Sequence, residues 1–486
     1  MQNIPQKSCL FYDLETTDKD PYGQIINLCY ILTDSDFNVI NDFSREIKIG
    51  RLQLPRAGAI LANKTDVIEH QKNTKSGERE VLYELWAFIN DIISQSKQVT
   101  IIGFNNLGFD QNFLRTSFIR NGLNPYYQKN VREADLFLLT QYLSITNKDF
   151  PRIKSEKKRK NQKENGKEKI SLSLESVTKA LGLLEGSQSH NSKDDVLLTI
   201  ELAKTYRSKF NINVVDFNPY QAGEIHKVPH KNKGKIIYRL DTQYDLSIQE
   251  IFTKSPFMFL DSNYRYSLWV DLDAFEKKRK SLRMAKIDSG ALFSDGILIS
   301  DEHWDSVANN ALEKFSKVDL SNYFTETECD IEQHIYRVDF SNIKALNQLI
   351  WHAGETELTI PDAKRILGRF RLTNYEVNGK QDDVFAKRLK DYALYRYGGQ
   401  MRIDRGQDYE DKLNESFPKK SFHPTFNALV NEINSLYETS TDSDKKLLGS
   451  LKRFYFESEI YSLAGKDLEQ IIESGKEETP AIQVSK

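Results

Sequence analysis

Cysteine, long apolar runs and net charge are all scarce in this chain of 486 residues. The three cysteines, Cys9, Cys29 and Cys329, fit neither a zinc motif nor a disulfide framework. Cys9 and Cys29 lie in apolar, strand-like runs, so we expect them to be reduced core residues in a cytoplasmic protein. No run of about 18 apolar residues and no apolar signal core is present, which predicts that no segment spans a membrane.

The charge balance excludes few partners. The chain has 68 basic and 70 acidic residues, for a formal net charge of −2. A nucleic-acid-binding protein needs a local basic track rather than a basic total. Such a run occurs at 152–169, with nine Lys/Arg and three Asp/Glu. It reads either as a solvated loop or as a basic arm that attracts phosphates, and these two interpretations are compatible.

Apolar residues make up 39% of the chain, enough to form several cores, and at roughly 100–200 residues per domain the length predicts two to four domains. Residues 1–212 have an α/β pattern. The expected strands are 8–15, 24–33, 37–49 and 98–104, and the expected helices are 80–94, 110–120, 133–143, 172–183 and 194–210. A β-rich region follows to about 342, with strand-like pieces at 235–240 and 264–270. Helical periods then dominate at 343–352, 360–369, 383–397, 425–438 and 443–464, before a polar tail over 476–486.

Two acids close the first expected strand. Asp13 and Glu15 are two positions apart, so they point to the same face of the strand. Adjacent carboxylates repel each other, and burial raises their pKa values, unless a divalent cation lies between them. Oxygen ligands at this spacing suit Mg²⁺ or Mn²⁺. Taken alone, such acids are more often solvated residues at a strand end.

Two further segments carry polar residues at element starts. A Gly/Asn-rich loop runs from Gly103 to Asp110, where Asp110 is either a ligand or a helix N-cap. His190 comes before a helix that contains Asp194 and Asp195. At helical spacing Asp195 aligns with inward-facing residues and Asp194 with a polar row, so Asp195 is the better ligand. A lone histidine such as His190 is more often structural.

Together, the three segments resemble the exonuclease motifs of the DEDDh group, which has an RNase H-like fold. Segments 11–17, 55–61, 103–110, 120–121, 174–182 and 190–195 resemble the bacterial exodeoxyribonuclease I family across residues 8–205, and 382–397 resembles a helix of that family's C-terminal domain. The resemblance implies an α/β RNase H-like exonuclease domain at 1–212, in which helices flank a mixed sheet. A small SH3-like β domain at 213–342 and an α-helical domain at 343–475 would follow. The chain departs from the family over 210–260 and at Ser173, where the family has an arginine.

The resemblance also implies an activity: 3′→5′ degradation of single-stranded DNA to 5′-mononucleotides, in DNA repair or recombination. Asp13, Glu15 and Asp195 would bind two Mg²⁺ ions, for which Mn²⁺ can substitute, and Asp110 would help directly or through water. His190 would be the general base, since its ordinary pKa of about 6.5 suits that role. The expected substrate-binding residues are Glu15, Thr16, Asn106 and Ser173, with the terminal nucleotide near a loop at 57–65.

Partners and alternatives follow from the same motifs. We expect a monomer that binds single-stranded DNA and, as a further partner, single-strand DNA-binding protein. An RNA-directed 3′→5′ exonuclease would have the same five residues, because the choice depends on whether the pocket accepts a 2′-hydroxyl. An inactive nuclease fold that only binds nucleic acid is the third interpretation, and dependence of the activity on Mg²⁺ separates it from the other two.

Overall fold

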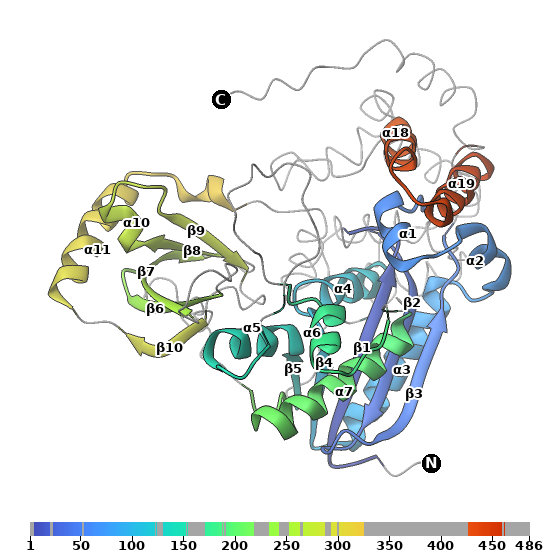
Figure 1. The fold of residues 1–486 in the computed structure, drawn as a ribbon, viewed down its shortest axis with the longest axis horizontal. Coiled ribbons are helices and arrows are strands. Elements are labelled where there is room, and N and C mark those ends of the chain that lie inside the picture. Colours follow the sequence, from blue (N-terminus) through green and yellow to red (C-terminus); the bar gives the residue numbers. More distant parts are fainter. Residues whose placement is uncertain are drawn as a thin grey trace, which may run out of the picture.

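The computed structural model in Figure 1 describes most of the first 217 residues and parts of the remainder. The described residues are 4–19, 23–50, 53–121, 123, 130–151, 153, 171–186, 188, 191–217, 233–242, 252–262, 266–286, 293–298, 301–324, 426–458 and 461.

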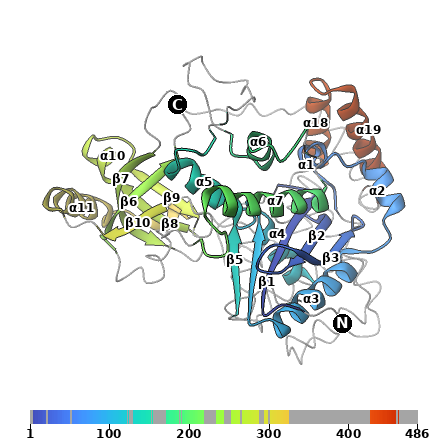
Figure 2. The same ribbon diagram turned by 60° about the horizontal axis from the view of Figure 1, so that its bottom comes forward.

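A five-stranded mixed sheet forms the centre of the N-terminal part. Its strands are β1 (Lys7–Thr16), β2 (Ile25–Thr33), β3 (Val39–Glu46), β4 (Gln98–Gly103) and β5 (Val131–Asp135). The order across the sheet is β3-β2-β1-β4-β5. The first three strands pair antiparallel, whereas β4 and β5 run parallel to β1 (Figure 2). The central strand β1 therefore has neighbours of both directions.

Helices cover both faces of this sheet. They are α1 (Ala57–Asn63), α2 (Val67–Asn73), α3 (Glu78–Gln95), α4 (Asp110–Arg120), α5 (Leu136–Thr146), α6 (Leu174–Ala180) and α7 (Ser192–Phe210). Cys9 and Phe11 of β1 pack in one core with α5, α6 and α7. Leu10, Tyr12 and Leu14 pack in the opposite core with α3 and α4. This alternation assigns the odd positions of β1 to the α7 side. A mixed sheet flanked by helices fits the predicted RNase H-like domain.

Several local predictions for this part need correction. The expected helix 133–143 is wrong at its start, because residues 131–135 form the edge strand β5 and α5 begins only at Leu136. Asp135 ends the strand and caps the helix, since its side chain accepts a hydrogen bond from the backbone N–H of Phe137. The expected loop at 57–65 is also wrong. It contains helix α1, whose C-cap residue Lys64 has the left-handed conformation.

A second sheet lies apart from the first in Figures 1 and 2. Its strands are β6 (Ile236–Thr242), β7 (Phe252–Ser262), β8 (Tyr266–Asp271), β9 (Leu282–Lys286) and β10 (Phe293–Leu298). They pair antiparallel in the order β10-β6-β7-β8-β9. The short helices α10 (Leu272–Glu276) and η2 (Leu320–Tyr323) accompany it. Helix α11 (Glu302–Phe315), which the β-rich prediction missed, packs its buried side on this sheet.

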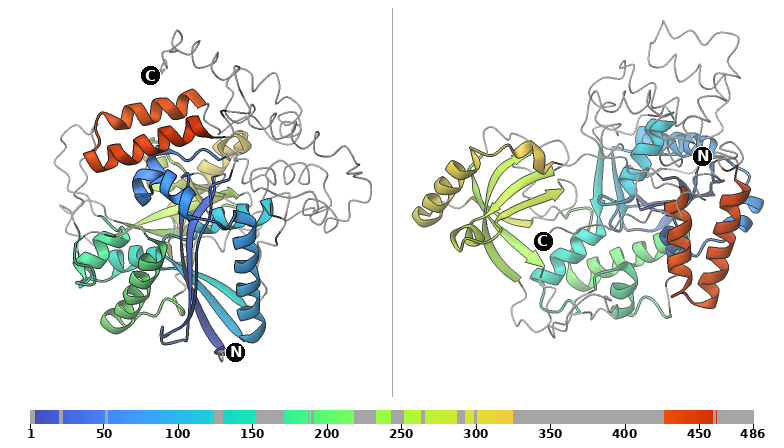
Figure 3. Two further views of the ribbon diagram at one scale, coloured as in Figure 1. Left: turned by 90° about the vertical axis from the view of Figure 1, so that its right-hand side faces the viewer. Right: turned by 90° about the horizontal axis from the view of Figure 1, so that it is seen from above.

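Two helices of the C-terminal region are described, α18 (Phe426–Tyr437) and α19 (Asp442–Glu457). They match the expected helices 425–438 and 443–464 in position. They lie against α1 and α2 of the N-terminal part, as Figure 3 shows from two sides. The expected helices at 343–352, 360–369 and 383–397 and the basic run 152–169 lie outside the described residues. The domain boundaries at 212, 342 and 475 stay predictions.

The thiols of Cys9 and Cys29 are free and buried, as expected of core residues, and burial raises the pKa of each to about 12. Cys329 lies outside the described residues. In the part of the chain that the structure describes, none of the helices is both long enough and apolar enough to cross a membrane.

Candidate metal centre and adjoining pocket

Asp13 and Glu15 continue the odd-numbered face of β1 beyond its apolar part. Cys9 and Phe11 on that face are buried against α7, and both acids are half-buried where the strand ends. The strand pairs with β2 through this stretch, so its backbone is fixed on that side. The expectation that both acids share one face is confirmed by this alternation.

The first turn of α7 brings a third acid to the same place. Asn191 begins the helix by accepting a hydrogen bond from the backbone N–H of Lys193. Asp195 is buried with 4% exposure, whereas Asp194 is exposed. The facing predicted for these two neighbours is therefore confirmed. A side-chain hydrogen bond with Gln188 holds the Asp195 carboxylate.

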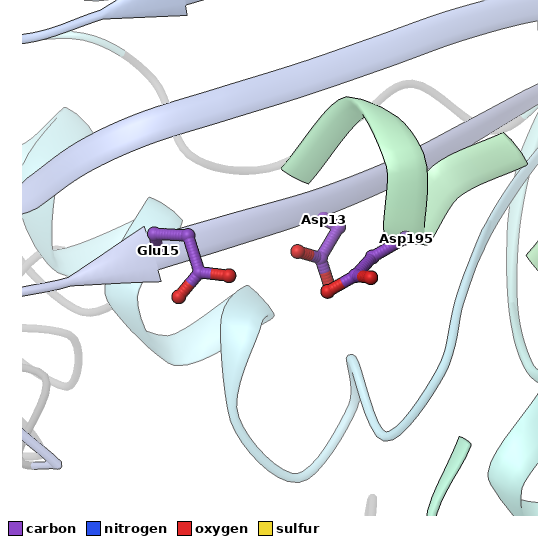
Figure 4. Close-up of side chains that lie close together, drawn as sticks. All are labelled: Asp13, Glu15 and Asp195. Carbon is purple, nitrogen blue, oxygen red and sulfur yellow. The ribbon is translucent and has the colours of Figure 1, made fainter. Parts of the chain in front are cut away.

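Asp13, Glu15 and Asp195 form one tight carboxylate cluster, shown in Figure 4. One oxygen atom from each lies within 4.8 Å of the others. Burial, with the added repulsion of neighbouring acids, raises the pKa of Asp13 well above its usual value and that of Glu15 to about 8. Burial raises the pKa of Asp195 to about 6. Three desolvated carboxylates at this separation need positive charge, and an all-oxygen donor set fits a hard divalent cation.

Asp110 lies beside this cluster without belonging to it. It is the first residue of α4 and is 5% exposed. The backbone N–H of Leu14 donates to its carboxylate, and burial still raises its pKa to about 8. The charge of Asp110 in turn raises the pKa values of Asp13 and Glu15. Asp110 therefore interacts electrostatically with Asp13 and Glu15, but it is not one of the three acids whose oxygens lie within 4.8 Å of one another.

The loop before Asp110 depends on close packing. A Cβ at Gly103 would lie 2.6 Å from Cβ of Asn106 and 3.1 Å from the carbonyl oxygen of Tyr12, so glycine is required there. Asn106 is 1% exposed, and its amide nitrogen can donate to the carbonyl oxygens of Gly103 and Ala134 at 3.3 and 3.2 Å. The amide thus joins the loop to the ends of β4 and β5. The expected contact of Asn106 with substrate stays a prediction.

Asp135 is a residue of this region that the sequence reasoning missed. Its carboxylate accepts hydrogen bonds from the backbone N–H groups of Asn105 (2.8 Å), Leu107 (3.3 Å) and Phe137 (2.8 Å). Burial raises its pKa to about 6, although these three bonds oppose that rise. Asp135 thus fixes the loop that leads to Asp110. The signal was present, because an Asp directly before an apolar helical run is a typical N-cap.

A pocket of about 380 Å³ adjoins the cluster through Glu15. Its walls come from the end of β1, from α1, from the start of α4 and from α18. The lining residues are Leu14, Glu15, Thr16, Asp18, Lys19, Arg56, Gly58, Ala59, Ala62, Asn63, Phe109 and Glu432. Helix α1 is tied to β1 at both ends, because Arg56 N–H donates to the carbonyl of Thr17 (2.7 Å) and Asn63 Nδ2 to that of Thr16 (3.1 Å).

The structure does not test the roles predicted for two other site residues. His190 lies outside the described residues, so its role as general base stays a prediction. Ser173 is the N-cap of α6, where its hydroxyl oxygen accepts from the backbone N–H of Ser176 at 3.3 Å. Its expected substrate contact stays a prediction as well.

Known proteins with similar sequence or structure point the same way. No family model matches the chain. It is 29% identical over 243 residues to exodeoxyribonuclease I of Escherichia coli strain K12, across 49% of this chain and 45% of that protein. The chain thus matches less than half the length of this relative. The zinc-bound form of E. coli ExoI with single-stranded DNA has a similar fold, with a TM-score of 0.53 at 17% identity over 94% of this chain and 100% of that one.

An ExoI/SSB-Ct complex is also similar in fold, with a TM-score of 0.52 at 17% identity over 93% of this chain and 99% of that one. The sequence match confirms the resemblance to exodeoxyribonuclease I that the motifs predict. The structural likeness, at this low identity, concerns the fold.

Proposed function

We propose that this protein is a 3′→5′ exonuclease that degrades single-stranded DNA to 5′-mononucleotides in a metal-dependent reaction. The observation that carries the proposal is the cluster of Asp13, Glu15 and Asp195 beside a pocket of about 380 Å³, which Glu15 lines. The carboxylates would bind the metal ions that hydrolysis of a phosphodiester requires, and the pocket would receive one terminal nucleotide. The polarity and the preference for DNA rest on the resemblance to exodeoxyribonuclease I.

In this proposal Asp13, Glu15 and Asp195 bind two Mg²⁺ ions, for which Mn²⁺ can substitute, and Asp110 assists directly or through water. Two bound divalent cations would stabilise the attacking and leaving oxygens of an in-line displacement. His190 accepts a proton from the attacking water. Because the acids are largely buried, solvent screens their charges less, and this strengthens their binding of the cations.

The terminal nucleotide occupies the pocket beside Glu15 and Thr16. The small residues Gly58, Ala59 and Ala62 on α1 leave space for a sugar or base, and Phe109 offers an aromatic face. The hydroxyl of Thr16 donates to the carbonyl of Asp18 (2.7 Å), which fixes the turn after β1. Together, these residues of the pocket wall would position the 3′ end so that its last phosphate lies beside the carboxylate cluster.

The proposal also covers the second sheet, the C-terminal helices and a protein partner. We assign the second sheet to a small SH3-like domain and the last described helices to the helical domain of the exodeoxyribonuclease I family. The ExoI/SSB-Ct complex supports a further partner, single-strand DNA-binding protein. The proposal takes the chain to act as a monomer. A role in DNA repair or recombination in the cytoplasm is part of the same proposal, and it rests on the resemblance to exodeoxyribonuclease I.

The test is product analysis on a 5′-labelled single-stranded oligonucleotide with Mg²⁺. A descending ladder of labelled products is expected, whereas early release of the labelled mononucleotide would contradict the polarity. The same assay on an RNA oligonucleotide separates the DNA enzyme from an RNA-directed exonuclease. Absence of any Mg²⁺-dependent product on either substrate would indicate a fold that only binds nucleic acid.

A further inference from the structure

The pocket has one wall residue from the far end of the chain, Glu432 of α18. Its Oε2 atom accepts from Nε of Arg56 at 2.7 Å and lies 2.6 Å from Nη2 of the same guanidinium. The two side chains are 26% and 24% exposed, so the pair is largely shielded from solvent. Charge-assisted bonds of this kind are among the stronger polar contacts in proteins.

Glu432 also acts at the start of α1. Arg56 occupies the N-cap position of this helix, but its side chain makes no capping hydrogen bond. The Oε1 atom of Glu432 accepts from the backbone N–H of Gly58 at 3.4 Å instead. An acidic group at this position satisfies a free N–H and suits the positive end of the helix. One carboxylate from α18 thus both caps α1 and neutralises Arg56.

Other contacts at this interface hold the helices together without reaching the pocket. Lys64 pairs with Asp444 at 2.8 Å at the other end of α1, and the Ser450 hydroxyl donates to Asp66 at 2.5 Å. Neither pair lines the pocket, and Glu432 is its one wall residue from the described parts of α18 and α19. Docking of the helical pair and shaping of the pocket are therefore carried by separable residues.

We propose that Glu432 is a positioning residue for the terminal nucleotide. By fixing Arg56 and the first turn of α1, it sets the width and the charge of the pocket beside Glu15. The C-terminal helical pair is then part of the site, and its role is more than packing against α1 and α2. This inference rests on the proposed function, because it concerns the pocket that would receive the 3′ end.

Loss of Glu432 has a defined consequence for the charges in the pocket. Asp18, another wall residue, is the next acidic group that interacts with Arg56 after Glu432. Without its partner, the guanidinium turns toward Asp18 and narrows the space between β1 and α1. The first turn of α1 also loses its cap, which loosens the wall formed by Gly58 and Ala59.

Steady-state kinetics on a short single-stranded oligonucleotide test this with Glu432→Ala and, as the matched control, Asp444→Ala. The control breaks an ion pair of the same interface outside the pocket. We expect Glu432→Ala to raise KM by about tenfold with kcat within about twofold, while Asp444→Ala leaves both within about twofold. Glu432→Gln, which keeps an oxygen acceptor for Gly58, should give an intermediate KM. An equal rise of KM in Glu432→Ala and Asp444→Ala, or an unchanged KM in Glu432→Ala, would overturn the proposal.

Hydrogen exchange of the α1 amides in the full-length protein without DNA gives a readout independent of activity. Glu432→Ala should speed exchange in the first turn of α1, and Asp444→Ala should leave those amides as in the wild type. Equal exchange in both variants would contradict the role of Glu432. If the wild type releases no mononucleotide at all, the proposed function fails, but the exchange experiment still decides whether Glu432 fixes α1.

Discussion

Carboxylate oxygens of Asp13 and Asp195 lie within 4.8 Å of each other, although the residues belong to the first strand and to the last helix of the N-terminal sheet domain. The two elements meet because the odd face of β1 packs against α7. Asp195 is in the first turn of α7, so the positive end of that helix faces the acids and offsets part of their repulsion. A bound cation would supply the remaining positive charge.

The raised pKa values of these acids predict how the stability of the metal-free protein changes with pH. A carboxyl with a raised folded pKa holds its proton to higher pH in the folded than in the unfolded chain, so its contribution to the free energy of unfolding falls as pH rises through the folded pKa. An unperturbed carboxyl has a pKa of about 4, and the folded values are about 6 for Asp195 and about 8 for Glu15, so the loss runs from about pH 4 to about pH 6 for Asp195 and on to about pH 8 for Glu15. Asp13→Asn should flatten the change of Tm over this range.

Mg²⁺ should oppose this loss of stability at higher pH, because protons and metal ions compete for the same carboxylates. Thermal unfolding at pH 6 and at pH 8, each with and without Mg²⁺, measures this. The rise in Tm on adding Mg²⁺ should be larger at pH 8 and should vanish in Asp13→Asn. A rise in Tm that is equal at both pH values, or that persists in the variant, would count against a metal site here.

Asp135 is expected to matter to the reaction although it lies outside the cluster. Asp135→Ala leaves three partly buried backbone N–H groups without their acceptor and should lower the free energy of unfolding by about 2–4 kcal/mol. The Mg²⁺-dependent rate should fall by roughly ten- to hundredfold, because the loop no longer positions Asp110. Asp135→Asn, which keeps one oxygen acceptor, should recover part of that rate.

The control for Asp135 is Asp301, an exposed N-cap of α11 whose carboxylate accepts from His303 and Trp304. Asp301→Ala should cost about 1 kcal/mol of stability and leave the rate unchanged. Chemical denaturation and single-turnover kinetics on both variants provide the comparison. Equal losses of rate would mean that Asp135 contributes stability alone.

Gly103 offers a test of the packing beneath the loop. In Gly103→Ala the new Cβ meets Asn106 and the Tyr12 backbone at distances that force the chain to shift, so we expect a loss of about 1–3 kcal/mol. Gly449→Ala in the middle of α19 meets no atom within 4 Å and should stabilise the protein by about 0.5–1 kcal/mol. Denaturant midpoints measure both. A neutral Gly103→Ala would show that the loop adapts without strain.

Local patterns in the sequence were enough to predict how the three acids of the cluster face, whereas the meeting of Asp195 with Asp13 and Glu15 was implied by the resemblance to the DEDDh motifs. The two-residue period of β1 assigned Asp13 and Glu15 to one face, and the helical period of α7 separated Asp195 from Asp194. Both inferences need only neighbours along the chain. The strand β5 escaped prediction because Arg132 and Glu133 are polar on a half-buried strand, and its position depends on pairing with β4.

Long-range contacts set the limit of the sequence reasoning. Arg56 and Glu432 are 376 positions apart. Arg56 belongs to the segment 55–61 that resembles the family, but no local pattern connects it to Glu432. The burial of Asn106 likewise depends on how closely β1, β4 and β5 approach at Gly103, which no local period reveals. Such residues become visible only when the packed elements are seen together.

The most direct test of the metal centre compares two neighbours on α7. Asp195 is buried in the cluster and Asp194 is exposed on the same helical turn, so Asp195→Asn and Asp194→Asn change equivalent charges in different places. The measurement is the Mg²⁺-dependent rate of mononucleotide release from a single-stranded DNA oligonucleotide. We predict that Asp195→Asn lowers this rate by at least about a thousandfold and that Asp194→Asn stays within about twofold of the wild type. Retention of activity in Asp195→Asn, or an equal loss in both variants, would contradict a catalytic metal centre at Asp13, Glu15 and Asp195.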